Sequence, residues 1–378
     1  MKYMLAAPDL SGREAEYVNE CLRSNWISSR GRYIAEFEER VAAFTQCRYA
    51  VATCNGTLGL YLALLGLGLQ PGDEVIVPSL TYVATANAVT YCGAAAVFAD
   101  SDPQTWCLSV ESVERLITRR TRGIIPVHLY GHPCDLAPLL ALARARGLWV
   151  LEDCAEAQGA SYDGRPVGSF GDAAVYSFFG NKIVTTGEGG MVVTNDAPLA
   201  NRLRLLRGQG MDPERTYWHP VLGYNFRMTN IQAAIGVGQM EHVEQLLRQR
   251  RQIAAWYRKR LHSEPRLTLP AEAARVRNVF WLYSVLVHDP DRRETIRQEL
   301  AAADIETRPF FYPVHTFPMY SGARTDVGCP GAMDLASRGI NLPTSSYLKE
   351  DDIDYIARTL RAALQRTQIS RLFTSDAA

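Results

Sequence analysis

The stretch Ser177-Phe178-Phe179-Gly180-Asn181-Lys182 places one lysine between an aromatic strand end and a glycine-rich turn, Thr185-Thr186-Gly187-Glu188-Gly189-Gly190. Most lysines keep their charge in water by extending from a loop, which is the alternative for Lys182. The apolar residues on both sides favour partial burial instead, and burial lowers the pKa of an amine toward neutrality. Because a neutral amine can form a Schiff base, the stretch predicts covalent chemistry at Lys182.

Outward from this stretch, short apolar runs alternate with helical patterns between residues 34 and 240. The expected strands are 49–53, 74–77, 95–99, 123–127, 148–152, 173–178 and 191–194. The expected helices are 34–45, 57–67, 82–92, 110–118, 136–146 and 197–207. This alternation predicts an α/β fold with a mostly parallel central sheet covered on both faces.

The pattern changes toward the C-terminus. A long helical stretch over 228–262 is followed by a strand-like run at 279–287 and a helix at 293–303. We therefore expect a large cofactor-binding domain over 1–240, with an N-terminal arm at 1–30, and a smaller α+β domain over 241–378.

Composition limits the classes of function. The chain has 378 residues, is 47% hydrophobic and balances 40 basic against 40 acidic side chains, which argues against a nucleic-acid partner. No apolar run approaches the roughly 18 residues of a membrane span, and no secretory signal is evident. Its eight cysteines include no CxxC pair, and its histidines lack metal-ligand spacing. We expect a cytoplasmic enzyme without a membrane partner or a metal site.

Four further features accompany the lysine. Asp153 ends an apolar strand, where it could pair with a cationic ligand or cap a following helix. Gly56 and Thr57 open a helix and could hold an anion, with a hydroxyl added by Ser177, although plain capping is the alternative. Tyr82 could stack on a flat ring or only pack. Together with Lys182, these residues suit a phosphorylated pyridine aldehyde. A dinucleotide fingerprint and a P-loop are both absent.

Several ordered blocks resemble one known family. They are Trp26-Ile27-Ser28-Ser29, Asn55-Gly56-Thr57, Val77-Pro78-Ser79-Leu80-Thr81-Tyr82, Val127-His128-Leu129-Tyr130-Gly131, Glu152-Asp153-Cys154-Ala155-Glu156, the Lys182 stretch and Gly223-Tyr224-Asn225-Phe226-Arg227-Met228. From about Asn25 to Leu342 the chain is similar to the sugar aminotransferases of the DegT/DnrJ/EryC1/StrS family. The resemblance implies the type I fold of pyridoxal 5′-phosphate enzymes.

The resemblance also implies a role for individual residues. Lys182 is expected to hold the cofactor as a Schiff base and then to shuttle a proton, and Asp153 to pair with the pyridinium nitrogen. The cofactor phosphate is expected to contact Gly56, Thr57 and Ser177, and the ring to stack on Tyr82. Asn225 is expected to reach the phosphate from the neighbouring subunit, which implies a homodimer with shared active sites.

Glu156 indicates one branch of the family, because many other members carry glutamine at this position, near the ring hydroxyl of the cofactor. Glutamate there resembles the perosamine synthase branch, which aminates GDP-linked 4-keto-6-deoxymannose with L-glutamate as donor. The residues expected on the substrate side are Arg227, Arg308, Tyr312 and His315.

Other substrates and functions are open. They include a dTDP- or UDP-linked keto sugar, a 3-keto sugar and a keto-cyclitol. A related dehydratase would carry histidine in place of Lys182, and a non-catalytic regulatory member of the fold would be expected to lose Lys182 or Asp153.

Overall fold

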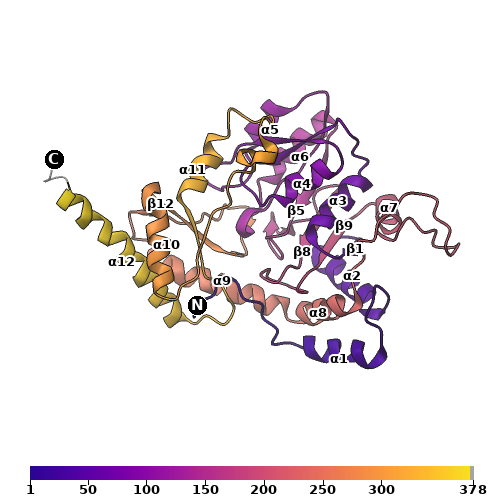
Figure 1. Ribbon diagram of the computed structural model, residues 1–378, viewed down its shortest axis with the longest axis horizontal. Helices are drawn as coiled ribbons and strands as arrows, with labels where there is room; N and C mark the ends of the chain where they lie inside the picture. The colour runs from indigo at the N-terminus through magenta and orange to yellow at the C-terminus, as the bar shows by residue number, and fades with distance from the viewer. Residues whose placement is uncertain (375–378) are drawn as a thin grey trace.

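The computed structural model describes residues 1–374, with side chains through Arg366; residues 375–378 of the predicted small domain lie outside the described part. Its centre is a seven-stranded sheet with the order β1-β9-β8-β5-β4-β2-β3 (Figure 1). The strands are β1 (Tyr49–Thr53), β2 (Glu74–Pro78), β3 (Ala95–Ala99), β4 (Thr121–Ile124), β5 (Trp149–Asp153), β8 (Ala173–Ser177) and β9 (Gly190–Thr194). Only β9 runs antiparallel to its neighbours, so the predicted mostly parallel sheet is confirmed.

Helices alternate with most of these strands, as the sequence predicts. They are α2 (Arg32–Thr45), α3 (Gly56–Gly66), α4 (Ala84–Tyr91), α5 (Val110–Leu116), α6 (Leu136–Arg146) and α7 (Ala197–Arg207). Every residue of β2, β8 and β9 is buried, as is typical of strands covered on both faces. This burial explains why their sequences are continuous apolar runs rather than alternating ones.

The long helical stretch expected over 228–262 is two helices, α8 (Asn230–Glu241) and α9 (Val243–Leu261). The break is at His242, whose backbone N–H donates to Gln239 instead of reaching Gly238. The His242 ring nitrogen Nδ1 lies 3.0 Å from the Gly238 carbonyl and occupies the acceptor that an unbroken helix would use. Helix α8 packs against α1 (Glu14–Ser24) and α2.

A second, antiparallel sheet follows in the C-terminal part, with the order β10-β12-β14-β13. Its strands are β10 (Leu267–Thr268), β12 (Tyr283–Val287), β13 (Arg308–Pro309) and β14 (Gly339–Leu342); the helices in this part are α10 (Arg293–Ala302), α11 (Pro330–Arg338) and α12 (Glu350–Thr374). A small third sheet joins β6 (Ser161–Tyr162), β7 (Arg165–Pro166) and β11 (Val276–Arg277). The strand expected over 279–287 begins only at Tyr283, because Val279 bonds to Gly131 next to the large sheet.

The buried apolar residues form two clusters. One surrounds the large sheet, and the other joins Tyr3 to residues between Ile253 and Leu364. The N-terminal residues lie against the C-terminal part, since the Tyr3 N–H donates to Asp304. The domain limits 1–240 and 241–378 stay a prediction. Among the described residues, no helix has the length and apolarity needed to cross a membrane.

Candidate active site

A cavity of about 400 Å³ lies where β5 and β8 end and α3 begins. This position fits the rule that ligands bind at the carboxyl ends of parallel strands. Eight of the residues expected from the sequence line it: Gly56, Thr57, Tyr82, Asp153, Glu156, Ser177, Lys182 and Arg308. The fold therefore brings together residues from segments that are far apart in the chain.

Lys182 lies in the turn after β8, where its backbone N–H donates to Phe179 at 2.9 Å. Its side chain is only 11% exposed, whereas the other lysines of the chain, at 2, 259 and 349, are exposed. Burial lowers the pKa of the Lys182 amine, and the carboxylates of Glu156 and Asp153 oppose that shift. The result is an amine that loses its proton more readily than an ordinary lysine.

Asp153, the last residue of β5, is buried and accepts hydrogen bonds from Thr85 Oγ1 at 2.8 Å and the Ala155 N–H at 3.1 Å. The bond to Ala155 caps a turn and not a helix, so the helix-capping alternative for this residue is not realised. Burial raises the pKa of this carboxyl. Within the described part of the chain the Asp153 carboxylate forms no ion pair. A protonated pyridine nitrogen therefore fits as its missing cation.

Glu156 is buried beside the lysine, with its Oε1 4.0 Å from the Lys182 amine. Its other oxygen accepts the Tyr130 N–H at 2.7 Å. Burial raises the pKa of Glu156 to about 7, against the attraction of Lys182. A carboxyl with this pKa can either donate or accept a hydrogen bond at neutral pH, as contact with a ring hydroxyl requires.

The start of α3 forms an anion cradle. Asn55 caps the helix by accepting the Leu58 N–H at 2.9 Å, and the first-turn N–H groups of Gly56 and Thr57 have no partner within the helix. A Cβ on Gly56 would lie 2.9 Å from the Cβ of Ser177, so only glycine allows this close approach. Helix start and serine hydroxyl converge on one point, which suits a phosphate.

Tyr82 is at the mouth of the cavity, in the turn before α4, with 58% of its surface exposed. Its ring lies 5.8 Å from that of Phe311, centroid to centroid. The exposed face is available to a flat ligand, in keeping with the expected stacking role.

Four expected residues lie outside the cavity lining: Asn225, Arg227, Tyr312 and His315. Asn225 is exposed and pairs with Gly208, while His315 Nδ1 lies 2.6 Å from Ser79 Oγ. Arg308 is in the lining and lies 3.5 Å from Glu306. The roles expected for these side chains stay proposals.

Three side chains of the site were missed in the sequence. Thr85 bonds to Asp153, Trp281 lies over Lys182, and Gln158 bonds to the carbonyl of Ser177 at 2.7 Å and the N–H of Val184 at 2.7 Å. The only available signal was for Thr85, a hydroxyl one helical turn after Tyr82. No local pattern connects Trp281 to a lysine about 100 residues away.

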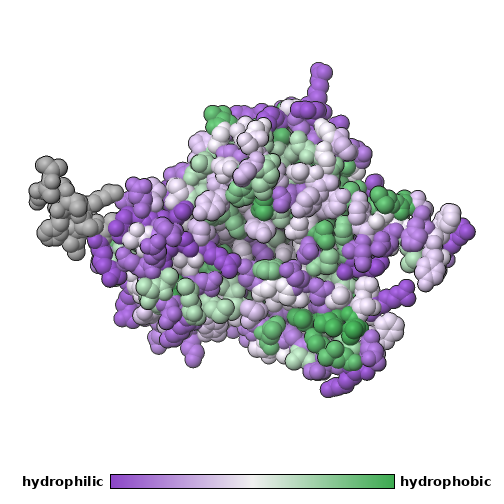
Figure 2. Space-filling view, viewed as in Figure 1, coloured by the Kyte–Doolittle hydropathy of each residue, from purple (hydrophilic) through white to green (hydrophobic). Residues whose placement is uncertain are grey.

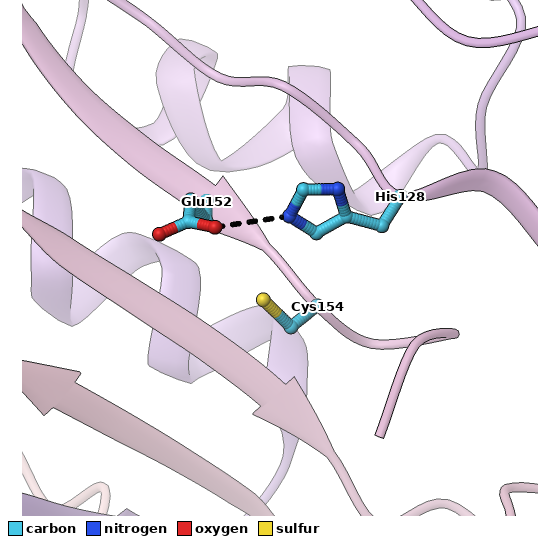
Figure 3. Close-up of side chains that lie close together, drawn as sticks. All are labelled: His128, Glu152 and Cys154. Atoms are coloured by element: carbon cyan, nitrogen blue, oxygen red, sulfur yellow. Dashed lines mark hydrogen bonds and ion pairs between the residues drawn. The ribbon is translucent and has the colours of Figure 1, made fainter. Parts of the chain in front are cut away.

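Next to Asp153, the side chains of His128, Glu152 and Cys154 lie close together, with donor atoms within 4.8 Å of one another (Figure 3). His128 Nδ1 accepts the Cys134 N–H at 3.0 Å, so the ring proton is on Nε2, which faces Glu152 at 3.1 Å. Glu152 also accepts three backbone N–H groups, from Gly168, Phe170 and Gly171. Burial raises the pKa of Glu152, but the hydrogen bond with His128, together with those from the backbone N–H groups, outweighs burial and lowers the pKa. The group supports the strand end that carries Asp153.

A nearly buried lysine, an unpaired strand-end aspartate and an anion cradle on this fold define a pyridoxal-phosphate enzyme. The model of the DegT/DnrJ/EryC1/StrS aminotransferase family matches residues 8–361. The chain belongs to this family of aminotransferases, and the predicted type I fold, transaminase class and pyridoxal 5′-phosphate cofactor are confirmed.

Two curated relatives are similar over nearly their whole length. GDP-perosamine synthase of Escherichia coli O157:H7 is 50% identical over 361 residues, which cover 95% of this chain and 98% of that protein. GDP-perosamine synthase of Caulobacter vibrioides is 50% identical over 363 residues, again 95% and 98%. The solved structure of the putative sugar aminotransferase Spr1654 from Streptococcus pneumoniae, in its PMP form, matches with a TM-score of 0.92 and 29% identity, covering 97% of this chain and 99% of that one.

Proposed function

We propose that this enzyme moves the amino group of L-glutamate to the keto carbon of a GDP-linked 4-keto-6-deoxymannose, as in perosamine formation. The observation that carries the chemistry is the Lys182 amine beside Glu156, in the same cavity as the helix start that could hold a phosphate. The nucleotide and sugar are inferred from the two relatives named GDP-perosamine synthase, each 50% identical to this chain.

When bound, pyridoxal phosphate supplies an aldehyde that condenses with amines and a ring that takes up an electron pair. Asp153 would keep the ring nitrogen protonated, and Gly56, Thr57 and Ser177 would hold the phosphate. Lys182, with its lowered pKa, removes a proton from the α-carbon of glutamate and later delivers one to the sugar carbon. Delivery of that proton to one face of the sugar carbon would give the new stereocentre a single configuration.

Both substrates are anionic, and arginine forms bidentate contacts with carboxylates and phosphates. Arg308 lines the cavity from β13 and is half-exposed, so it can meet either substrate. Arg227, Tyr312 and His315 are assigned to the outer part of the substrate site.

The minimal active unit is a homodimer in which Asn225 of one subunit contacts the phosphate held by the other. Asn225 is exposed in a single chain, which leaves it available to a partner. The segment after α7 extends away from the body of the molecule (Figure 1) and carries exposed apolar side chains, including Tyr217, which is 86% exposed, and Leu222. Figure 2 shows further apolar side chains gathered over the region of α1 and α8. Apolar surface of this kind is typical of protein interfaces.

We assign the enzyme to the cytoplasm, where its unpaired cysteines would remain reduced.

A panel of keto substrates tests the assignment. The purified enzyme is incubated with glutamate and GDP-, dTDP- or UDP-linked keto sugars or keto-cyclitols, and release of 2-oxoglutarate is measured. We expect fastest turnover with the GDP-linked 4-keto-6-deoxymannose. Faster turnover of another class would replace the substrate and leave the aminotransferase chemistry in place.

A second measurement tests the chemistry itself. The protein with its cofactor bound should absorb at about 420 nm, and glutamate should bleach this band, because an imine of the cofactor absorbs there. Lys182→Ala should fold but lose both the band and turnover. Normal turnover by Lys182→Ala would contradict the proposed role of the lysine.

A further inference from the structure

Trp281 lies directly over the reactive lysine. The Lys182 Nζ is 3.8 Å from the centroid of the indole ring, and the tryptophan itself is only 4% exposed. The indole N–H donates to the carbonyl of Asn181 at 2.7 Å, which fixes the residue that precedes the lysine. One side chain thus contacts both the amine and the turn that carries it.

The backbone of Trp281 is also held in place by hydrogen bonds. Its carbonyl accepts hydrogen bonds from the Arg250 guanidinium at 2.9 Å and the Thr344 hydroxyl at 2.7 Å. Arg250 is a buried residue of α9, and its guanidinium also donates to Thr344 at 2.8 Å. Tyr130 stacks on the indole, with the ring centroids 6.5 Å apart. These contacts fix the position of the ring.

We propose that Trp281 is a positioning residue for Lys182. Its ring face stabilises the protonated amine inside the cavity, and its N–H holds the turn so that the amine stays over the cofactor site. The inference rests on the proposed role of Lys182 as the reacting amine.

The charged groups around Lys182 explain why an aromatic ring is a better partner for its ammonium group than a further carboxylate. The charged groups that act on the amine are Glu156, Asp153 and Arg308. A further carboxylate would compete with the cofactor and substrates for the proton and would itself need a partner. The face of an indole attracts a cation without carrying a titratable proton.

A purely structural role predicts the opposite sign. If Trp281 served only to keep water out, its removal would hydrate the amine and raise the pKa of Lys182. If its ring face stabilises the ammonium form, removal lowers this pKa. The direction of the shift therefore separates the two roles.

The test uses Trp281→Phe, which keeps a weaker ring face, and Trp281→Met, which keeps a long apolar side chain without one. The matched control is Trp149→Met, at the opposite end of β5 from Asp153. In the cofactor-free full-length protein, the pH dependence of Lys182 acetylation by acetic anhydride is followed by mass spectrometry, with exposed Lys349 as internal reference.

We expect the pKa of Lys182 to fall in the order Trp, Phe, Met, by about one unit for Trp281→Met, and to be unchanged in the control. In the cofactor-loaded enzyme, kcat should fall more than the KM for glutamate changes, with partial rescue by phenylalanine. An unchanged or raised pKa in either variant overturns the proposal, and Trp281→Phe alone decides it if Trp281→Met does not fold. The acetylation readout involves no sugar, so failure of the GDP-sugar assignment would not affect it.

Discussion

Three of the titratable side chains that line the cavity are buried or nearly so, and burial shifts the pKa of each in the direction that favours its neutral form. The pKa of Lys182 is lowered, that of Asp153 is raised and that of Glu156 is raised to about 7. Each shift is the cost of removing a charged group from water, and each is relieved when a ligand supplies the opposite charge or a hydrogen bond. The shifts of Asp153 and Glu156 support the proposed contacts of Asp153 with a cationic ring nitrogen and of Glu156 with a ring hydroxyl.

Asp153→Asn tests the first of these contacts. An amide cannot balance a protonated ring nitrogen, so kcat should fall by roughly 10² to 10³, the usual effect of removing one electrostatic contact in an active site. The fold should persist, since an asparagine can still accept from Thr85. Steady-state kinetics check the prediction, and near-normal kcat would show that the carboxylate does not hold the ring.

Glu156→Gln tests the effect of pH on stability. Burial raises the pKa of Glu156 from 4.5, its ordinary value, to about 7 in the folded protein, so the folded state binds more protons than the unfolded state between pH 4.5 and pH 7. The contribution of Glu156 to the free energy of unfolding of the cofactor-free protein should therefore be greatest below about pH 4.5. It should decrease as the pH rises to 7. Glutamine removes that decrease.

The measurement is urea unfolding of the cofactor-free wild type and Glu156→Gln at pH 5 and pH 8. We expect the wild type to lose about 1–3 kcal/mol more than the variant over this interval. Glu111→Gln, at an exposed position of α5, is the control and should behave as the wild type. Equal losses in wild type and Glu156→Gln would contradict the assigned pKa.

At the scale of elements, the site depends on how closely α3 approaches β8. The first residue of the helix and the last residue of the strand meet at Gly56 and Ser177. The glycine allows two backbones to converge on the same anion.

Gly56→Ala should weaken cofactor binding and not folding. Alanine favours a helix by about 1 kcal/mol, but its Cβ would meet the Ser177 Cβ at 2.9 Å and displace one wall of the cradle. A displacement of this kind should raise the cofactor Kd by about 10- to 100-fold, measured by fluorescence titration. Gly66→Ala, at the other end of α3, contacts only flexible Leu203 and Leu199 side chains and should leave Kd unchanged.

At the scale of the whole molecule, the C-terminal part completes a site built on the large sheet. Trp281, Arg308 and Phe311 all line the cavity, and all follow α9 in the chain. A single chain still leaves Asn225 outside the lining. A shared site in a homodimer would complete the contacts to the phosphate.

Mixing two impaired variants tests the shared site. Lys182→Ala and Asn225→Ala proteins are each expected to be impaired, the second through weaker phosphate contact. After unfolding and refolding of an equimolar mixture, about half of the dimers should be mixed, and each should contain one intact site. Recovery of about a quarter of wild-type activity is expected, whereas no recovery would show that Asn225 acts within its own chain.

The sequence by itself determined the alternation of strands and helices and identified eight of the residues that line the cavity. Strands buried on both faces are mostly apolar, and polar residues at their carboxyl ends, such as Asp153 in β5 and Ser177 in β8, are placed at the ligand edge by the topology alone. The cofactor could be predicted from the family blocks because each block is a short, continuous segment of the sequence.

Only the tertiary structure decided what surrounds those residues. Three contacts join segments that no local pattern in the sequence connects: Thr85 with Asp153, His128 with Glu152, and Trp281 with Lys182. Burial, which sets the pKa values of Lys182 and Glu156, is likewise a property of the packed molecule. A sequence specifies which groups are present at a strand end, but their distances and their loss of water arise only when distant segments pack together.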